Sequence, residues 1–216
     1  MQQVRIEAGP GLVLSADLVV PQRAEGVVVF AHGSGSSRFS PRNRQVAQAL
    51  REQRMATLLA DLLSPTEEQE DDRTALLRFD IGLLAARVSC LVDWCTRHTE
   101  LARLPLGLFG ASTGAAAALV SAADRPEAVR AVVSRGGRPD LAGPALERAT
   151  APTLLLVGGA DEVVLGLNRD AAARLAAEHQ LHVVPGATHL FEEPGALAEV
   201  AREAARWFTG HLPDST

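Results

Sequence analysis

A serine, an acid and a histidine occur in that order in three glycine-containing stretches of the chain. Ser112 lies in "LGLFGASTG", Asp161 in "LLLVGGADE" and His189 in "VVPGATHLF". A serine hydroxyl is a weak nucleophile at neutral pH and needs a base to take its proton. Histidine suits that role, and a buried carboxylate can fix its tautomer and stabilise the imidazolium. These three residue types could therefore carry out acyl transfer through a covalent intermediate.

The residues around Ser112 predict a sharp turn from a strand into a helix. An apolar run precedes the serine, and the alanine-rich stretch 113–123 has helical composition. Gly110 and Gly114 lack the side chains that would clash in such a turn. A helix that begins near Thr113 directs backbone N–H groups at a developing oxyanion. We expect the backbone N–H groups of Thr113 and of Ser34, in the loop after an earlier strand, to form an oxyanion hole.

The elements that must position these residues alternate along the chain. A hairpin is expected from 4–8 and 12–21, with its turn at 9–11, because both segments alternate in polarity. The acidic run 66–72 is expected to be a solvated loop. Continuous apolar runs predict strands at 26–33, 56–63, 104–110, 129–137, 152–159 and 181–186. Apolar residues at helical spacing predict helices at 41–54, 74–98, 113–123, 168–179 and 194–212.

This alternation predicts an α/β fold, with a mostly parallel sheet, an antiparallel N-terminal hairpin and helices on both faces. With no repeat and no linker-like stretch, we expect one domain over residues 1–216. Ligands of such sheets bind beyond the carboxyl ends of the strands. Ser112, Asp161 and His189 each follow a predicted strand there.

Composition restricts the function classes. The chain has 216 residues, 47% of them hydrophobic and 22% charged, which is typical of a globular protein. A net charge of −5 without a basic cluster argues against nucleic acid and against anionic membrane surfaces as partners. No signal-peptide layout and no apolar run of transmembrane length occur. We expect a cytoplasmic protein without cofactor or metal, with Cys90 and Cys95 as structural thiols, and a homodimer is an open possibility.

Four motifs together resemble those of the α/β-hydrolase superfamily. "GASTG" (110–114) is similar to its nucleophile elbow and "HGSGSS" (32–37) to its oxyanion loop. "GGADEVV" (158–164) and "GATHLFEEPG" (186–195) are similar to its acid and histidine loops. Among these enzymes the chain most resembles small serine hydrolases without a cap, of the dienelactone-hydrolase-like family. Dienelactone hydrolases use a cysteine where this chain has Ser112.

The resemblance implies an α/β-hydrolase fold and a serine hydrolase that cleaves small esters or thioesters. It implies Ser112 as nucleophile, His189 as base and Asp161 as the acid that orients it. Glu162 is an alternative acid, but both the resemblance and the position directly after "VGGA" favour Asp161. Larger relatives often carry a cap between their sixth and seventh strands. Here 14 residues (138–151) join those strands, too few for a cap domain.

Other residues are candidates for contact with a substrate. His32 and Gly33 belong to the oxyanion loop, where His32 could instead brace the loop through hydrogen bonds. Phe191 and Phe39 could supply aromatic walls, since aromatic residues are only 4% of the chain.

Arg135 lies near the end of another predicted strand (129–137) and has two interpretations. It could face the cleft and meet an anionic group of the substrate, or it could pair with Asp140 or Glu162 in a structural role. We favour the structural pairing.

Two other function classes are considered. A nucleotide-binding enzyme is suggested by "GSGSSR" (33–38) between a strand and a helix, and Asp61 ends the next strand. However, Arg38 replaces a glycine of the dinucleotide fingerprint, Asp61 lies farther along than the usual spacing of about 20 residues, and no G-K-[ST] occurs. The other class is a non-catalytic binding protein with a hydrolase fold, which reaction with a fluorophosphonate probe would distinguish.

Overall fold

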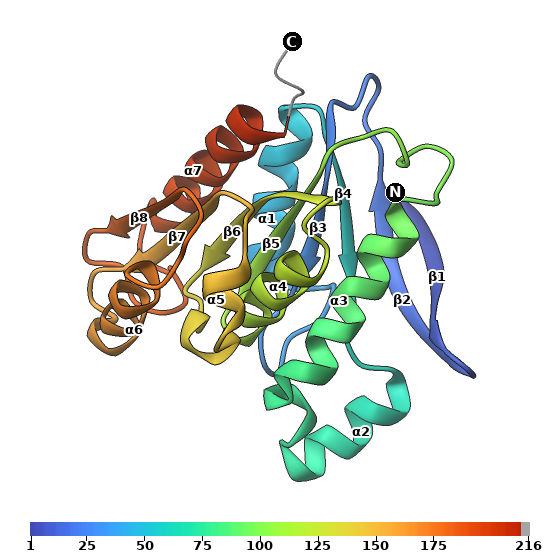
Figure 1. Ribbon diagram of the computed structural model, residues 1–216, viewed down its shortest axis with the longest axis horizontal. Coiled ribbons are helices and arrows are strands. Elements are labelled where there is room, and N and C mark those ends of the chain that lie inside the picture. The colour runs from blue at the N-terminus through green and yellow to red at the C-terminus, as the bar shows by residue number, and fades with distance from the viewer. Residues whose placement is uncertain (213–216) are drawn as a thin grey trace.

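The computed structural model, which describes residues 1–212, is built around an eight-stranded sheet with the order β1-β2-β4-β3-β5-β6-β7-β8 (Figure 1). The strands are β1 (Gln2–Gly9), β2 (Leu12–Val19), β3 (Gly26–Ala31), β4 (Met55–Ala60), β5 (Leu106–Ala111), β6 (Val129–Arg135), β7 (Thr153–Gly158) and β8 (His179–Val184). β1 pairs with β2, and β2 with β4, in antiparallel fashion, and the pairs from β4 to β8 are parallel. The carboxyl ends of six strands therefore meet at one edge.

Helices cover both faces of the sheet, as the alternation of elements predicts. α1 (Pro41–Glu52) and α7 (Ala196–His211) pack together on one face, and α3 (Ile81–Cys95) and α4 (Thr113–Asp124) pack on the other (Figure 1). Every residue of β3, β4, β5 and β7 is buried. The predicted mostly parallel α/β architecture with an antiparallel N-terminal hairpin is confirmed.

The acidic run forms a helix, so the expectation of a loop is wrong. α2 (Pro65–Thr74) projects from the body of the molecule at the lower edge of the view in Figure 1. Its first turn is closed by a capping box, in which the Ser64 hydroxyl accepts from the Glu67 N–H and the Glu67 carboxylate accepts from the Ser64 N–H. Pro at the first helical position favours the same start. Local capping therefore outweighs the high charge.

Two further helices differ from expectation in their bounds. A short turn, η1 (Leu77–Phe79), separates α2 from α3, so α3 begins at Ile81 rather than near residue 74. The Asp80 side chain caps α3 by accepting from the Leu83 N–H at 2.9 Å. α6 (Glu162–Ala172) begins six residues earlier than expected and ends earlier, because its buried face starts at Val164 and Leu165.

Short helices join β6 to β7. They are η2 (Pro139–Ala142) and α5 (Ala145–Arg148), which leaves no cap domain at this position, as predicted.

Both cysteine thiols are free. Among residues 1–212, no helix combines the length and the apolar character that crossing a bilayer would require.

Candidate active site

Ser112 stands at the turn between β5 and α4 in a strained backbone conformation. Its φ is 50° and its ψ is −121°, a combination that costs energy in a residue with a side chain. A Cβ on Gly114 would overlap the carbonyl oxygen of Ala31, and a Cβ on Gly110 would overlap the backbone of Ala115. Only glycine fits at these two positions. The turn therefore holds the serine at the carboxyl edge of the sheet, directly before the first turn of a helix.

Asp161 and His189 are joined at the same edge. Asp161 follows β7 and His189 follows β8, and the two strands are neighbours in the sheet. His189 Nδ1 lies 2.7 Å from Asp161 Oδ2. The Asp161 side chain is 15% exposed and that of His189 is 40% exposed. Because Nδ1 donates its proton to the carboxylate, Nε2 is left as the free basic nitrogen.

Ser112 and His189 line one cleft of about 160 Å³. Its lining residues are Gly33, Ser34, Ser36, Ser40, Arg42, Ala111, Ser112, Arg135, His189 and Leu190. Within residues 1–212 the Ser112 hydroxyl makes no hydrogen bond to His189. Such contacts are often long in an enzyme without substrate and tighten when substrate binds. The cleft thus contains the nucleophile and base candidates together with the expected oxyanion loop.

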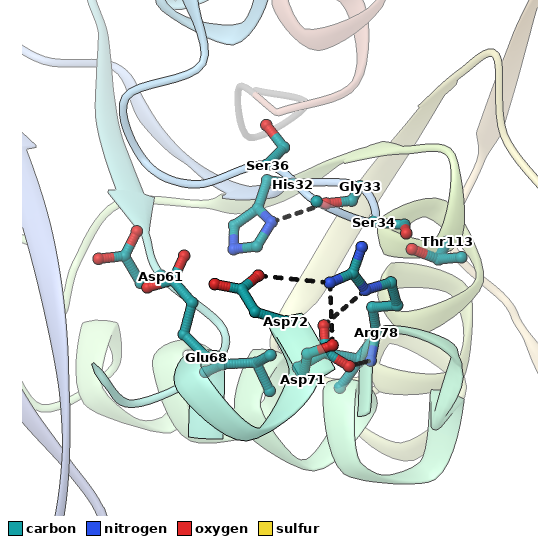
Figure 2. Close-up of a pocket in the computed structure, with 13 residues that line it drawn as sticks. His32, Gly33, Ser34, Ser36, Asp61, Glu68, Asp71, Asp72, Arg78 and Thr113 are labelled. Carbon is teal, nitrogen blue, oxygen red and sulfur yellow. Dashed lines mark hydrogen bonds and ion pairs between the residues drawn. The ribbon is translucent and has the colours of Figure 1, made fainter. Parts of the chain in front are cut away.

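His32 holds the oxyanion loop rather than facing the cleft with Ser112. The Leu62 N–H donates to His32 Nε2 at 3.1 Å, so Nδ1 carries the proton and donates to the Gly33 carbonyl at 2.9 Å (Figure 2). Burial lowers the pKa of His32 from its ordinary value of 6.5, which keeps the ring neutral. In a planar trans peptide the carbonyl and the next N–H point in opposite directions. Fixing the Gly33 carbonyl therefore also fixes the direction of the Ser34 N–H.

The two predicted oxyanion donors are free, and the loop is close to the serine. Within the described residues, no hydrogen-bond acceptor pairs with the backbone N–H of Ser34 or of Thr113. A Cβ on Gly33 would lie 2.9 Å from the Cβ of Ser112, so the loop passes against the nucleophile candidate with no side chain between them. Gly33 is thus needed for this close approach.

A second, smaller cavity of about 80 Å³ shares Gly33, Ser34 and Ser36 of the oxyanion loop with the cleft (Figure 2). It is lined by His32 and Thr113, by Asp61 directly after β4 and by acidic residues of α2, with Arg78 bonded to Asp71. Asp61, also in this lining, forms an ion pair with Arg38, whose backbone N–H it also accepts at 2.8 Å. The acid that a dinucleotide site would use is therefore engaged within the protein.

Arg135 does not make the ion pair that the sequence favours. Asp140 instead accepts two hydrogen bonds from Arg138, at 2.8 and 2.9 Å, and Glu162 makes no ion pair with Arg135. Arg135 is 9% exposed and donates to Asn43 Oδ1 at 3.4 Å. Burial lowers its pKa to about 10. The predicted structural pairing of Arg135 with Asp140 or Glu162 is therefore wrong, and Arg135 lines the cleft.

Phe191 is placed in the core, which corrects the expectation of an aromatic wall. It is 2% exposed and belongs to the apolar cluster under α1 and α7. Its φ of 56° turns the chain after His189, so that Leu190, not Phe191, lines the cleft. Sequence reasoning also missed Arg42 and Ser40 as lining residues. The signal was available, since they open the helix that follows the oxyanion loop.

The profile of the dienelactone hydrolase family matches residues 14–209. A solved dienelactone hydrolase from Anabaena variabilis is 54% identical, superposes with a TM-score of 0.95 and is covered over 98% of both chains. This chain belongs to the dienelactone hydrolase family. The expected α/β-hydrolase fold is confirmed, and the family is one of hydrolases.

Other relatives add fold and context. Est1E from Butyrivibrio proteoclasticus has the same fold at 15% identity, with a TM-score of 0.81 over 96% of this chain and 98% of that one. Two proteins from Mycobacterium tuberculosis, strains CDC 1551 / Oshkosh and H37Rv, are each 56% identical over 98% of this chain and carry the provisional name phosphoribosyl transferase. The chain spans about half the length of these curated relatives, 46% of each.

Proposed function

We propose that the protein is a serine hydrolase that cleaves small esters or thioesters through Ser112, His189 and Asp161. The observation that carries the proposal is the strained Ser112 at the start of α4, in one cleft with a histidine held 2.7 Å from a carboxylate. Membership of a hydrolase family supports it.

In the proposed reaction, Ser112 Oγ attacks the substrate carbonyl carbon while His189 Nε2 takes its proton. The carbonyl oxygen becomes an oxyanion that accepts from the backbone N–H groups of Ser34 and Thr113. The C–O or C–S bond then breaks, and the leaving group takes the proton from His189. Water attacks the resulting acyl-enzyme by the same route, which releases the acid and restores the serine.

Asp161 has the role of orienting His189. Its carboxylate accepts from Nδ1, so the imidazole keeps the tautomer with a free Nε2 and the imidazolium is stabilised as it forms. The helix dipole of α4 adds positive potential near the oxyanion.

The proposal is tested with a fluorophosphonate probe and a p-nitrophenyl ester. The wild type should be labelled and should hydrolyse the ester. Ser112→Ala should lose labelling and most turnover, by a factor of roughly 10³ or more, with an unchanged unfolding midpoint. Ser15→Ala, on β2 and not among the residues that line the cleft, is the control. Retained hydrolysis in pure Ser112→Ala would disprove the assignment, and a wild type that never reacts would favour the binding-protein alternative.

A further inference from the structure

The guanidinium of Arg135 is a buried cation for which the described protein supplies no counter-charge. No carboxylate of residues 1–212 forms an ion pair with it, and its Nε is buried without a hydrogen-bond partner. Among the described residues, the one hydrogen bond that the side chain makes is to the neutral amide of Asn43, at 3.4 Å. A buried charge without a partner is unfavourable, and proteins normally pair or solvate it.

The position of Arg135 relates it to the reaction. It ends β6, beside Ala111 in the sheet register, and its carbonyl accepts from the Ser112 N–H at 3.3 Å. The side chain lines the cleft that contains Ser112 and His189. The contact with Asn43 places it against the first turn of α1. A substrate group that met Arg135 would therefore lie close to the carbonyl under attack.

The first turn of α1, which Arg135 contacts through Asn43, adds to the positive potential of the cleft. Arg42 lies in the first turn of α1 and also lines the cleft. Its partner Glu192, at 3.2 Å, is 65% exposed, and exposed pairs of this kind are weak and readily exchanged. Ser40, which caps α1, lines the cleft with its helix start, where backbone dipoles favour an anion.

We propose that Arg135 binds an oxyanion of the substrate, so that the preferred substrates are esters that carry a carboxylate or a phosphate-type group near the scissile bond. The guanidinium fork matches either group through two parallel hydrogen bonds. Arg42 and the first turn of α1 complete the anion subsite. The inference rests on the proposed hydrolase function and specifies its substrate class.

The kinetic test compares esters that differ in charge. Mono-p-nitrophenyl succinate and p-nitrophenyl 3-phosphonopropionate carry a carboxylate and a phosphonate on the acyl group, and p-nitrophenyl butyrate is the neutral match. Phenyl acetate and 3-acetoxybenzoate make the same comparison on the alcohol side. The wild type should favour an anionic ester by about tenfold or more in kcat/KM, mainly through KM. The favoured ester identifies which anion the subsite accepts.

Variants connect the preference to the subsite. Arg135→Gln should reduce the anionic-to-neutral ratio of kcat/KM by about tenfold, and Arg42→Gln should reduce it less. Arg44→Gln removes the same charge from α1 outside the cleft and should keep the ratio. A wild type without preference in either ester set, or an Arg135→Gln variant that keeps the preference, would overturn the inference.

A binding measurement separates this inference from the hydrolase proposal. Disodium succinate or inorganic phosphate should raise the unfolding temperature of Ser112→Ala more than sodium chloride of equal ionic strength does, because a ligand that binds only the native state stabilises it. Ser112→Ala/Arg135→Lys should lose most of that shift, which covers the case in which the glutamine variant does not fold. A shift without any esterase activity would keep the anion subsite and reject the hydrolase. Ester hydrolysis with no charge preference and no shift in unfolding temperature would keep the hydrolase proposal and reject the anion subsite.

Discussion

Asp161 and Glu162 are adjacent carboxylates at the start of α6, and their surroundings differ at the scale of a single residue. Asp161 is partly buried and accepts from His189, whereas Glu162 is exposed in the first turn of the helix. A carboxylate can orient a histidine only where it reaches Nδ1. Substituting each residue in turn therefore compares a carboxylate that contacts His189 with one that only lies in the first turn of α6.

We expect Asp161→Asn to lower kcat/KM for p-nitrophenyl acetate by about 10²–10⁴, because an amide can donate to Nδ1 and stabilise the wrong tautomer. Glu162→Gln is the matched control and should change kcat/KM little. The measurement is steady-state hydrolysis, with circular dichroism to verify folding. An equal fall in both variants, or a fall in Glu162→Gln alone, would show that the acid is misassigned.

The loop after β3 is the element that depends most on one buried side chain. His32 receives a hydrogen bond from Leu62, two residues beyond β4, and gives one to Gly33 in its own loop. The ring thus ties the oxyanion loop to the neighbouring strand in its neutral form. Protonation would replace the Nε2 acceptor with a donor facing the Leu62 N–H.

The stability of this loop should depend on pH. Desolvation lowers the pKa of His32 below 6.5 despite the opposing hydrogen bond to Gly33 and the nearby carboxylates. The unfolded chain therefore binds the proton at a higher pH than the native protein, and the free energy of unfolding falls as pH drops below about 6.5, by at most about 1.4 kcal/mol per pH unit. His32→Asn should lack this component. Urea midpoints from pH 7 to pH 5 measure it.

The control for that experiment is His179→Asn, since His179 is exposed and, within residues 1–212, its side chain hydrogen-bonds only to the carbonyl of Ala177. It should follow the wild-type dependence. Other groups titrate in the same range, so the quantity of interest is the difference between wild type and His32→Asn. If the difference in unfolding free energy between wild type and His32→Asn stays constant from pH 7 to pH 5, His32 does not stabilise the loop in its neutral form.

Strands and the serine turn were predictable from sequence because their signals are local. Fully buried parallel strands require continuous apolar runs, and the elbow requires Gly110 and Gly114. α2 was missed because its acidic composition was given more weight than Ser64, Pro65 and Glu67, which specify a helix start. Capping residues were the better guide there.

The site was predictable in position but not in its partners. Residues that follow parallel strands must meet at one edge, which is why Ser112 and His189 share a cleft. The turn into η2 determines which arginine pairs with Asp140. It places Arg138, directly before η2, within hydrogen-bond distance of the Asp140 carboxylate. Arg135 is therefore left without an ion-pair partner among the described residues, and the spacing of residues in the sequence does not predict this pairing.

At the scale of the whole molecule, the cleft is small and polar. Typical ligand pockets measure roughly 300–1,000 Å³, whereas this cleft measures about 160 Å³. Leu190 is the one large apolar side chain among its described lining residues. Between β6 and β7 there are only the short segments η2 and α5, so no cap encloses an acyl chain there. The cleft as described therefore offers little apolar surface to a long substrate.

We therefore expect a preference for short acyl groups. Each CH₂ buried in an apolar pocket would gain about 0.8 kcal/mol, or roughly fourfold in kcat/KM, until the pocket is full. With p-nitrophenyl esters from C2 to C12, measured below their solubility limits, kcat/KM should be level or falling beyond about C4 to C6. Leu190→Ala should alter the profile among the shortest esters, because this side chain is the apolar contact available to them. A steady rise through C10 would mean that substrate binding opens an apolar channel, and the short-chain assignment would then be wrong.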